Sequence, residues 1–291
     1  MYTEDKPING KALYTPKGAA MEYGRVGCNF YTGCPHNCEY CYLKRGITGK
    51  ALGGTEVQLK KCFKDEKHAM DIFKREVNNN LDACRQHGIF FSFTTDPLIE
   101  ETRELTFRAM ASAISFGVPV YVLTKDASFI DSEAGKWWLD LLLADPTLVH
   151  FGFTLTGRDD MEPNASPNEE RIEAMRILHY AGFPTWASIE PVIEWKHSLR
   201  VIEMSLGCCD HYKVGLRSGV KKDYYNIAQS GAAIQRIVQA VESFGKTIYL
   251  KESTRGLLRQ YLQPGAYEVF LSHAVDVDGK PIKNDYPIAY G

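Results

Sequence analysis

The fold of this chain is restricted most by an alternation of short apolar runs with amphipathic segments between residues 88 and 253. The apolar runs are rich in β-branched and aromatic residues, which is typical of strands buried on both faces. The segments between them carry apolar residues at helical spacing, and several end at a glycine, such as Gly117 and Gly182. We therefore expect strands at residues 24–31, 88–97, 118–125, 148–156, 184–193, 211–217 and 246–253.

Helices are expected between these strands. The clearest start is Ser166, which has Glu169 three residues later and reads as a helix N-cap with a capping box. The other helical patterns cover residues 66–87, 103–117, 132–145, 197–207 and 224–245, with 166–182 beginning at Ser166.

Buried strands that alternate with helices predict a parallel sheet with helices outside it. The fold class is therefore α/β, as a partial or closed parallel (β/α) barrel over residues 24–263. An N-terminal extension (1–23) precedes the barrel, and the glycine- and proline-containing tail (264–291) predicts an irregular C-terminal cap. Active sites of such barrels lie at the carboxyl ends of the strands.

Charge and hydropathy narrow the function classes. The 34 basic and 36 acidic residues give a net charge of −2, so the chain as a whole does not attract nucleic acid, although a local basic groove could. We find no apolar run of about 18 residues that would span a membrane. The first 20 residues are polar and do not resemble a secretory signal, so we expect a cytoplasmic protein without a membrane partner.

Half of the eight cysteines fall between residues 28 and 41, which indicates a metal rather than disulfides. Cys34, Cys38 and Cys41 form a C-x-x-x-C-x-x-C motif, and thiolates select zinc, copper(I) or iron–sulfur clusters. A structural zinc site would need a fourth ligand, for which Cys28 and His36 are the nearest candidates. Three cysteines on one loop instead suit a 4Fe-4S cluster with one iron left open, and a zinc loop is the alternative.

The stretch "TGCPHNCEYCYLKR" (32–45), placed ahead of an α/β repeat, resembles the cluster loop of the radical S-adenosylmethionine superfamily. The resemblance implies a radical SAM barrel in which the open iron chelates S-adenosylmethionine. One electron from the cluster would then cleave this cofactor to a 5′-deoxyadenosyl radical that abstracts hydrogen from a substrate. Tyr40 supplies the aromatic residue expected before the third cysteine.

Within that superfamily the chain is similar to the spore photoproduct lyase group and its DNA repair photolyase-like relatives. The similarity is carried by residues 32–45, 93–106, 120–125 and 153–182. It implies that Tyr40 lies beside the adenine and that Thr95, Lys125 and Thr154 contact S-adenosylmethionine. Lys125 would face the cofactor carboxylate. At a later strand end, Ser188 and Glu190 could bind the ribose hydroxyls.

The sequence departs from the lyases at one position. They carry a hydrogen-donor cysteine two residues before the Thr-Asp-Pro segment, where this chain has Phe93, whose ring cannot donate a hydrogen atom. Tyr42 matches a relay tyrosine of the lyases and is present. We therefore predict against repair of thymine dimers by the lyase mechanism, with Cys208 or Cys209 as candidate replacement donors.

Substrate contacts are expected on the strand at 211–217, where Lys213 and Arg217 lie four residues apart and point the same way. An anionic substrate, such as a nucleotide or nucleic acid, fits these residues and the basic ones around them; a peptide or small metabolite is the alternative. A non-catalytic iron–sulfur or zinc protein is the third hypothesis. For an enzyme, we expect oxygen sensitivity and a reductant such as flavodoxin or ferredoxin. The basic residues that accompany Lys213 and Arg217 in this prediction are Lys221, Lys222, Lys251, Arg255 and Arg259.

Overall fold

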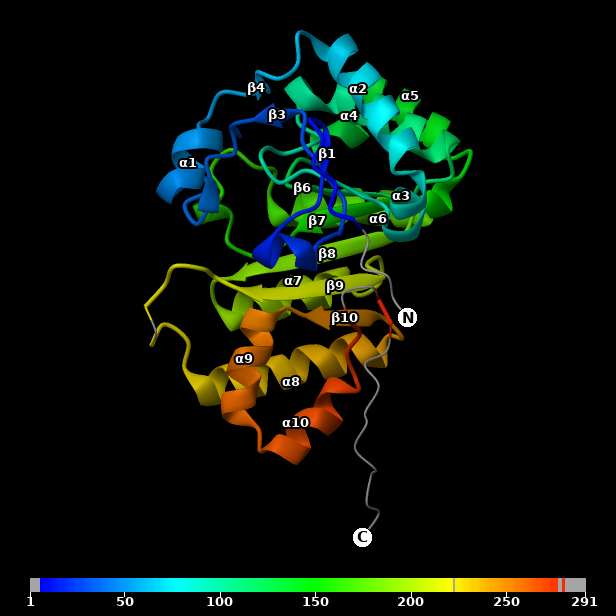
Figure 1. Ribbon diagram of the computed structural model, residues 1–291. Coiled ribbons are helices and arrows are strands. Elements are labelled where there is room, and N and C mark those ends of the chain that lie inside the picture. The colour runs from blue at the N-terminus through cyan, green and yellow to red at the C-terminus, as the bar shows by residue number, and fades with distance from the viewer. Residues whose placement is uncertain (1–5, 222, 277–278, 281–291) are drawn as a thin grey trace. The chain divides into compact units, whose positions relative to one another are not determined.

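The protein is described by a computed structural model that covers residues 6–221, 223–276 and 279–280 (Figure 1). The chain divides into two compact units. Unit 1 comprises Met1–Phe153 and Asp159–Thr185, and unit 2 comprises Thr154–Arg158 and Trp186–Gly291. The division falls inside the predicted barrel domain of residues 24–263.

Unit 1 is built on a sheet in the order β1-β2-β5-β6-β7, in which β2, β5, β6 and β7 are parallel and β1 is antiparallel to β2. A separate two-stranded sheet pairs β3 with β4. Phe91, Val122 and Phe151 are register partners on adjacent strands and are completely or almost completely buried, so they anchor the core of this unit. The strands are β1 (Leu13–Tyr14), β2 (Gly27–Cys28), β3 (Tyr31–Thr32), β4 (Gln58–Leu59), β5 (Ile89–Phe91), β6 (Val120–Thr124) and β7 (Val149–Thr154).

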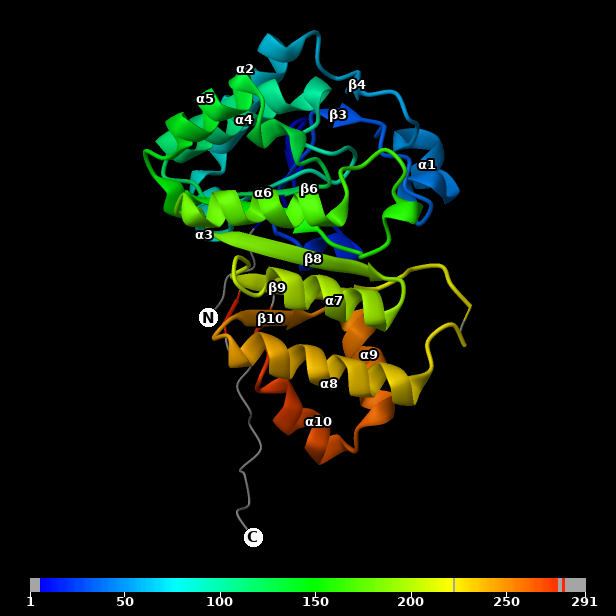
Figure 2. The same cartoon turned by 180° about the vertical axis from the view of Figure 1, so that it is seen from behind.

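Helices α2, α4 and α5 lie together in both views, and α4 contacts both α2 and α5 (Figures 1 and 2). The single helix predicted at 66–87 is interrupted at Asn80, which leaves the helical region and separates α2 from α3. The helices are α1 (Gly46–Leu52), α2 (Glu66–Asn79), α3 (Leu81–His87), α4 (Glu100–Ser115), α5 (Glu133–Leu142) and α6 (Asn168–Tyr180).

The prediction that Ser166 is the N-cap of α6 is wrong. The N-cap is Pro167, and the Ser166 hydroxyl instead accepts a hydrogen bond from the backbone of Ala127 at 2.9 Å. The first amide of the helix, on Asn168, donates to the Asp159 carboxylate at 2.8 Å. The Asp159 carboxylate thus takes the place of a local cap, and the Ser166 hydroxyl bonds to the loop that contains Ala127.

Unit 2 contains the parallel sheet β8-β9-β10. Figure 2 shows α7 and α8 side by side against this sheet. The Tyr212 hydroxyl in β9 meets the Ser205 hydroxyl of α7 at 3.0 Å, so this side of the sheet faces the helices. The elements are β8 (Thr185–Val192), α7 (Trp195–Ser205), β9 (His211–Leu216), α8 (Ile227–Ser243), β10 (Thr247–Leu250), α9 (Glu252–Tyr261) and α10 (Pro264–Leu271).

The parallel α/β architecture expected from the sequence is confirmed, but the closed form of the barrel is wrong, because the described strands of each unit form an open sheet. The C-terminal cap is also more regular than expected. Its first eight residues form α10, and its last eleven lie outside the described residues. Across the described ranges, no helix has the length and hydrophobicity needed to cross a membrane.

Glu76 of α2 fastens the N-terminal segment to unit 1. Its carboxylate accepts hydrogen bonds from the consecutive backbone amides of Lys11, Ala12 and Leu13 at 2.8, 3.0 and 2.8 Å. Ala12 and Leu13 are fully buried, and Leu13 pairs with Cys28 of β2. The extension predicted from the sequence is therefore an integral edge of the sheet.

Replacing Glu76 by Gln should lower the free energy of unfolding by about 2–4 kcal/mol, because an NH₂ group would face backbone donors and hydrogen bonds to a charged group are worth about 1.5–3 kcal/mol each. Urea unfolding measures this change. The control is Glu173→Gln in the exposed pair with Arg176, which should cost less than about 0.5 kcal/mol. Equal effects of the two substitutions would contradict the anchoring role.

Candidate functional site

The cysteine loop follows β3 and begins with a backbone turn that requires glycine. Gly33 has a φ of +82°, and a Cβ atom there would come within 2.0 Å of the Glu56 carbonyl oxygen. The amide of Cys34 then donates to the Gly54 carbonyl at 2.9 Å, and the amide of Cys41 donates to the Cys38 carbonyl at 3.2 Å. The loop thus presents three thiols from a tightly fixed backbone.

The three predicted ligands differ in exposure: Cys38 is buried, whereas Cys34 and Cys41 are partly exposed. Burial raises the pKa of Cys34 to about 12, and the Asp96 charge adds to this while Lys125 opposes it. Burial raises the pKa of Cys38 too, again against Lys125. Within the described part of the chain, no three His, Cys, Asp or Glu side chains are arranged as metal ligands. The cluster therefore stays a prediction that rests on the donor set.

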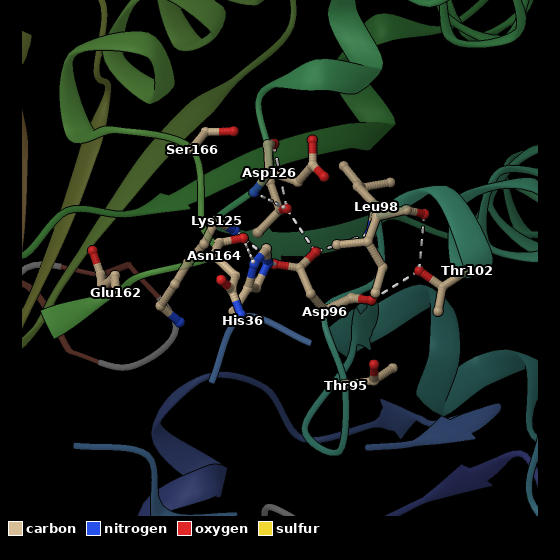
Figure 3. Close-up of polar contacts among 12 residues, drawn as sticks. His36, Thr95, Asp96, Leu98, Thr102, Lys125, Asp126, Glu162, Asn164 and Ser166 are labelled. Atoms are coloured by element: carbon tan, nitrogen blue, oxygen red, sulfur yellow. Dashed lines mark hydrogen bonds and ion pairs between the residues drawn. The ribbon is translucent and has the colours of Figure 1, made fainter. Parts of the chain in front are cut away.

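Asp96 organises the loops around these cysteines (Figure 3). It follows β5, is 6% exposed, and both of its carboxylate oxygens accept hydrogen bonds. Oδ1 accepts from the Thr124 hydroxyl at 2.7 Å and from the Leu98 amide at 3.0 Å. Oδ2 accepts from the Lys125 amide at 2.7 Å and from His36 Nε2 at 2.9 Å. One carboxylate thus joins the cysteine loop, the segment after β5 and the end of β6.

His36, between the first two cysteines, carries a positive charge in this arrangement. Its Nε2 meets the Asp96 carboxylate and its Nδ1 meets the Asn164 carbonyl oxygen at 3.0 Å. Because both partners are acceptors, both ring nitrogens must donate. Burial lowers the pKa of His36, but the Asp96 charge and the hydrogen bonds outweigh it and raise the pKa. Burial alone would raise the pKa of Asp96, yet the His36 charge and hydrogen bonds lower it to about 2.

Residues 161–164 hold the cysteine loop from the other side. The Glu39 amide donates to the Met161 carbonyl at 3.0 Å, and the Asn164 side chain donates to the Pro35 carbonyl at 2.8 Å. The loop therefore has backbone and side-chain contacts to this segment as well as to Asp96.

Tyr40, the aromatic residue before the third cysteine, is oriented by an ion pair. Its hydroxyl donates to one oxygen of Glu162, and the other oxygen pairs with Arg171 at 2.9 Å. Both members of the pair have side chains that are 0% exposed. Desolvation and the Glu162 charge together raise the pKa of Tyr40 well above its ordinary value, so the phenol stays neutral.

Lys125 and Thr95 supply polar groups that the described protein leaves without a hydrogen-bond partner. The Lys125 ammonium lies 5.9 Å from the centre of the Tyr40 ring, and the described residues provide it with no ion pair. Burial lowers the pKa of Lys125, but Cys38 and Glu162 outweigh this and raise it. The buried Thr95 hydroxyl also lacks a hydrogen-bond partner among the described residues, and no dashed line reaches it in Figure 3. A cation near the thiols of Cys34 and Cys38 fits a cluster with an anionic cofactor group.

Tyr42 and Phe93 lie together, as the resemblance to the lyases implies. The Tyr42 hydroxyl donates to the Phe93 carbonyl oxygen, and the Tyr42 side chain is half exposed. The Phe93 ring packs 4.5 Å from the Phe90 ring, and Tyr14 and Tyr23 complete the cluster at 6.4 and 6.3 Å. Phe93 is therefore a packing residue at the position where the lyases hold their donor.

The remaining residues predicted to bind the cofactor belong to unit 2. Thr154 ends β7 and is 3% exposed, and Ser188 in β8 is 1% exposed. Glu190 is paired with Lys251, whose Nζ lies 2.7 Å from its carboxylate. Ribose binding by Ser188 and Glu190 stays a prediction, and the Glu190 carboxylate is already held by a lysine.

Cys208 and Cys209 do not lie where a hydrogen donor was expected. A donor is expected at the carboxyl ends of the strands, but both cysteines precede β9 and lie at its amino end. Their thiols donate to the carbonyls of Ser205 and His211 at 3.5 and 3.2 Å, and both residues are at most 1% exposed. The active face of such a sheet is at the carboxyl ends, so this position does not favour the two cysteines, and their role as hydrogen donors stays a prediction.

The two residues predicted to contact substrate lie in β9 or directly after it. Lys213 lies inside the strand and is 8% exposed, whereas Arg217 directly follows it. The Arg217 amide donates to the Tyr225 hydroxyl at 2.8 Å, and its buried Nε has no hydrogen-bond partner among the described residues. Of the other basic residues in this region, Lys222 lies outside the described residues.

Sequence reasoning missed the residues that hold the site together. From the sequence, His36 is only a candidate fourth ligand, Asp96 is a polar residue at a strand end, and Glu162 is part of a segment similar to the lyases. A signal was present, because Asp96 directly follows the predicted contact residue Thr95, and the Glu162-Pro163-Asn164 run lies in the segment that resembles the lyases. Their pairing partners are far apart in sequence and could not be read from spacing.

Comparisons with known proteins support the fold. No family model matches the sequence. An uncharacterized protein of Methanocaldococcus jannaschii is 27% identical over 181 residues, which cover 57% of this chain and 59% of that protein, so the match spans less than two thirds of the relative. Two mutants of spore photoproduct lyase superpose with TM-scores of 0.62 and 0.61 at 13% identity. They cover 84% and 81% of this chain and 79% of their own chains. The resemblance to spore photoproduct lyase is confirmed at the level of the fold.

Replacing Asp96 by Asn should lower the free energy of unfolding by about 2–4 kcal/mol, because four donors would face an amide and the His36 charge would lose its counter-ion. Chemical unfolding followed by circular dichroism measures the loss. Asp145→Asn is the control, since that carboxylate accepts only from the accessible Thr147 hydroxyl in the described structure, and it should change stability by less than about 0.5 kcal/mol. A tolerated Asp96→Asn would show that the carboxylate does not organise the loops.

Proposed function

We propose that the chain is a radical S-adenosylmethionine enzyme with a partial (β/α) barrel, in which Cys34, Cys38 and Cys41 hold a 4Fe-4S cluster. The observation that carries this proposal is the Lys125 ammonium, which lies near the cysteine loop without a carboxylate partner in the described structure. A lysine in that place is suited to the carboxylate of S-adenosylmethionine. The zinc-loop alternative gives no role to this cation.

When bound, the cluster would supply one electron to cleave S-adenosylmethionine, and the resulting 5′-deoxyadenosyl radical would abstract hydrogen from the substrate. The residues of the chain would position the bound cluster and cofactor and enclose them. Asp96 and His36 fix the loop that carries the thiols, while Glu162 and Arg171 hold the Tyr40 ring in one orientation. Fixed geometry of this kind restricts where a reactive species can go.

The other predicted contacts complete the proposal. The Thr95 hydroxyl, which lacks a partner in the described structure, is available to the cofactor, and we assign further contacts to Thr154, Ser188 and Glu190. Tyr42 is proposed as a residue near the radical because its hydroxyl reaches the Phe93 backbone. We propose an external reductant such as flavodoxin or ferredoxin, and oxygen sensitivity follows from an open iron.

The substrate class is proposed from charge. A nucleic acid or nucleotide fits the cations Lys213 and Arg217. The reaction differs from that of the lyases, because Phe93 offers no hydrogen atom and is packed by three aromatic neighbours. A peptide or small metabolite as substrate would leave these cations without a role. Hydrogen transfer distinguishes the substrate classes: deuterium should enter 5′-deoxyadenosine from labelled nucleotide or nucleic acid and not from labelled peptide.

Anaerobic reconstitution of the full chain with iron and sulfide should give brown protein with about four irons per chain, and Cys38→Ala should abolish the colour and the iron. Cys84→Ala is the matched control, because Cys84 is a buried cysteine of α3 outside the loop and should leave the iron unchanged. Iron analysis and the visible absorption spectrum report the result.

Three outcomes of this experiment are decisive. A colourless protein that binds zinc would replace the cluster by a zinc loop. A full cluster that releases no 5′-deoxyadenosine from S-adenosylmethionine under dithionite would make the protein a non-catalytic iron–sulfur protein. Release of 5′-deoxyadenosine by the unmodified chain and its loss in Cys38→Ala would support the enzyme.

Lys125→Met should weaken S-adenosylmethionine binding about tenfold to a hundredfold while the iron content stays constant, because a charge-assisted hydrogen bond is worth about 1.5–3 kcal/mol. Equilibrium dialysis of the reconstituted protein measures the dissociation constant. Lys136→Met on the exposed side of α5 serves as the control and should leave binding unchanged. Unaltered binding in Lys125→Met would assign the lysine to a structural role.

A further inference from the structure

The position at which the lyases hold their hydrogen donor is occupied here by Phe93, whose backbone is hydrogen-bonded on both sides. Its carbonyl oxygen accepts from the Tyr42 hydroxyl, and its amide donates to Asn29 Oδ1 at 2.8 Å. Side chains that this backbone holds therefore lie beside the position of the lyase donor.

Asn29 connects this backbone to a second tyrosine. Because its Oδ1 accepts from the Phe93 amide, its other terminal atom is the donor Nδ2, which lies 2.8 Å from the Tyr14 hydroxyl oxygen. Asn29 is 6% exposed, and its backbone amide donates to the Ala12 carbonyl at 3.3 Å. One buried amide group thus fixes the Tyr14 hydroxyl, and the Tyr14 ring lies 6.4 Å from the Phe93 ring.

The Tyr14 hydroxyl accepts a hydrogen bond and does not donate one within the described structure. Asn29 Nδ2 can only donate, so the phenol oxygen is the acceptor, and the described residues offer the phenol hydrogen no acceptor. Burial raises the pKa of Tyr14 above its ordinary value, and the Asn29 hydrogen bond opposes this only in part, so the phenol is neutral. Tyr14 thus carries a hydrogen atom that these residues leave unengaged.

Gly27 makes room for this phenol. It is the register partner of Tyr14, and a Cβ atom there would come within 3.0 Å of Tyr14 Cζ and 3.2 Å of Phe93 Cε2. A side chain at position 27 would therefore displace the hydroxyl end of the ring. Because Asn29 follows β2 and Phe93 follows β5, the phenol lies at the carboxyl ends of these strands, where the sites of such sheets are found.

The phenol also lies on the face of the sheet that α2 does not cover. The Phe91 ring packs 6.1 Å from the Phe73 ring of α2, so Phe90, which precedes Phe91 in β5, points to the opposite face. Gly27 is the register partner of Phe90 and shares that face. The ring of Tyr14 lies over Gly27, so it is on the open side of the sheet rather than among the helices.

We propose that Tyr14 is the hydrogen-atom donor of this chain, in place of the cysteine that Phe93 replaces. A carbon radical on the substrate would take the phenol hydrogen: the O–H bond breaks, a C–H bond forms, and a neutral phenoxyl radical remains on Tyr14. One electron from a reductant of the flavodoxin or ferredoxin class and one proton from water restore the phenol. The role rests on the proposed radical function, and Asn29 is a positioning residue that holds the phenol oxygen.

The test needs no substrate, because the 5′-deoxyadenosyl radical is itself a carbon radical that takes hydrogen from a donor in reach. The reconstituted full chain is incubated in D₂O with S-adenosylmethionine and dithionite, and mass spectrometry measures deuterium in 5′-deoxyadenosine. Phenol and thiol hydrogens exchange with D₂O, whereas hydrogens on carbon do not. Most of the product should carry one deuterium, and Tyr14→Phe should reduce the labelled fraction about tenfold while total release stays within about twofold.

Tyr23→Phe is the matched control, because the Tyr23 ring also lies beside Phe93, at 6.3 Å; the labelled fraction should stay within about twofold. Asn29→Ala, which removes the hydrogen bond to the phenol oxygen, should lower the labelled fraction about threefold and serves alone if Tyr14→Phe does not fold. Circular dichroism verifies the fold of each variant. Samples frozen during turnover should show a tyrosyl radical by electron paramagnetic resonance, and Tyr14→Phe should lack it.

The outcomes separate this donor from the radical function itself. Unlabelled 5′-deoxyadenosine, or a label that Tyr14→Phe retains, overturns the donor and leaves the radical-enzyme proposal intact. Loss of the label in Cys208→Ala, Cys209→Ala or Tyr42→Phe, with retention in Tyr14→Phe, assigns the donor elsewhere. A full cluster that releases no 5′-deoxyadenosine removes the radical-enzyme proposal and the donor with it. Loss of label with unchanged release supports Tyr14, because weaker cofactor binding or misfolding would lower both.

Discussion

The buried carboxylate of Asp96 is the constraint on which the candidate site depends. A carboxylate withdrawn from water is costly unless its oxygens are hydrogen-bonded and its charge is paired, and Asp96 meets both conditions through His36 and three other donors. These donors come from three separate segments of unit 1. The position of the cysteine loop is therefore tied to the end of β6 by the need to satisfy one side chain.

The same requirement shapes the charges around the loop. His36, Lys125 and Arg171 are positive and Asp96 and Glu162 are negative, so three cations and two carboxylates leave an excess of one. This excess lies next to thiols whose ligand form is anionic. Positively charged groups nearby stabilise thiolates, which is consistent with the proposed role of the three cysteines as cluster ligands.

The sequence was informative wherever the signal was local. Buried strands and amphipathic helices have their own periodicity, so the parallel α/β class and most elements could be predicted from it. Ser166 shows the limit: its local capping pattern was correct in form, but the more distant Asp159 took the helix amide. Cys208 and Cys209 lead into β9 and therefore meet its amino end, whereas the sites of such sheets lie at the carboxyl ends of the strands.

The interactions of the site were hidden because they join distant parts of the chain. His36 and Asp96 are 60 residues apart, and Tyr40 and Glu162 are 122 residues apart. Neither pair has a spacing that marks it, although the residues themselves stand within similar segments. The cysteine spacing could be recognised because its chemistry requires neighbours on one loop. The supporting network could be recognised only after folding had brought its members together.

The packing of Phe93 ties the position at which this chain differs from the lyases to the N-terminal segment. Its ring contacts Phe90 of the sheet and two tyrosines, Tyr14 and Tyr23, of the N-terminal segment, which Glu76 holds in place. Phe93 is partly buried, and a cysteine at this position would leave a gap among these rings and lose most of their contacts. The effect of the residue at position 93 therefore depends on the N-terminal segment that surrounds it. A cysteine introduced there alone would need compensating changes in that segment to be packed as Phe93 is.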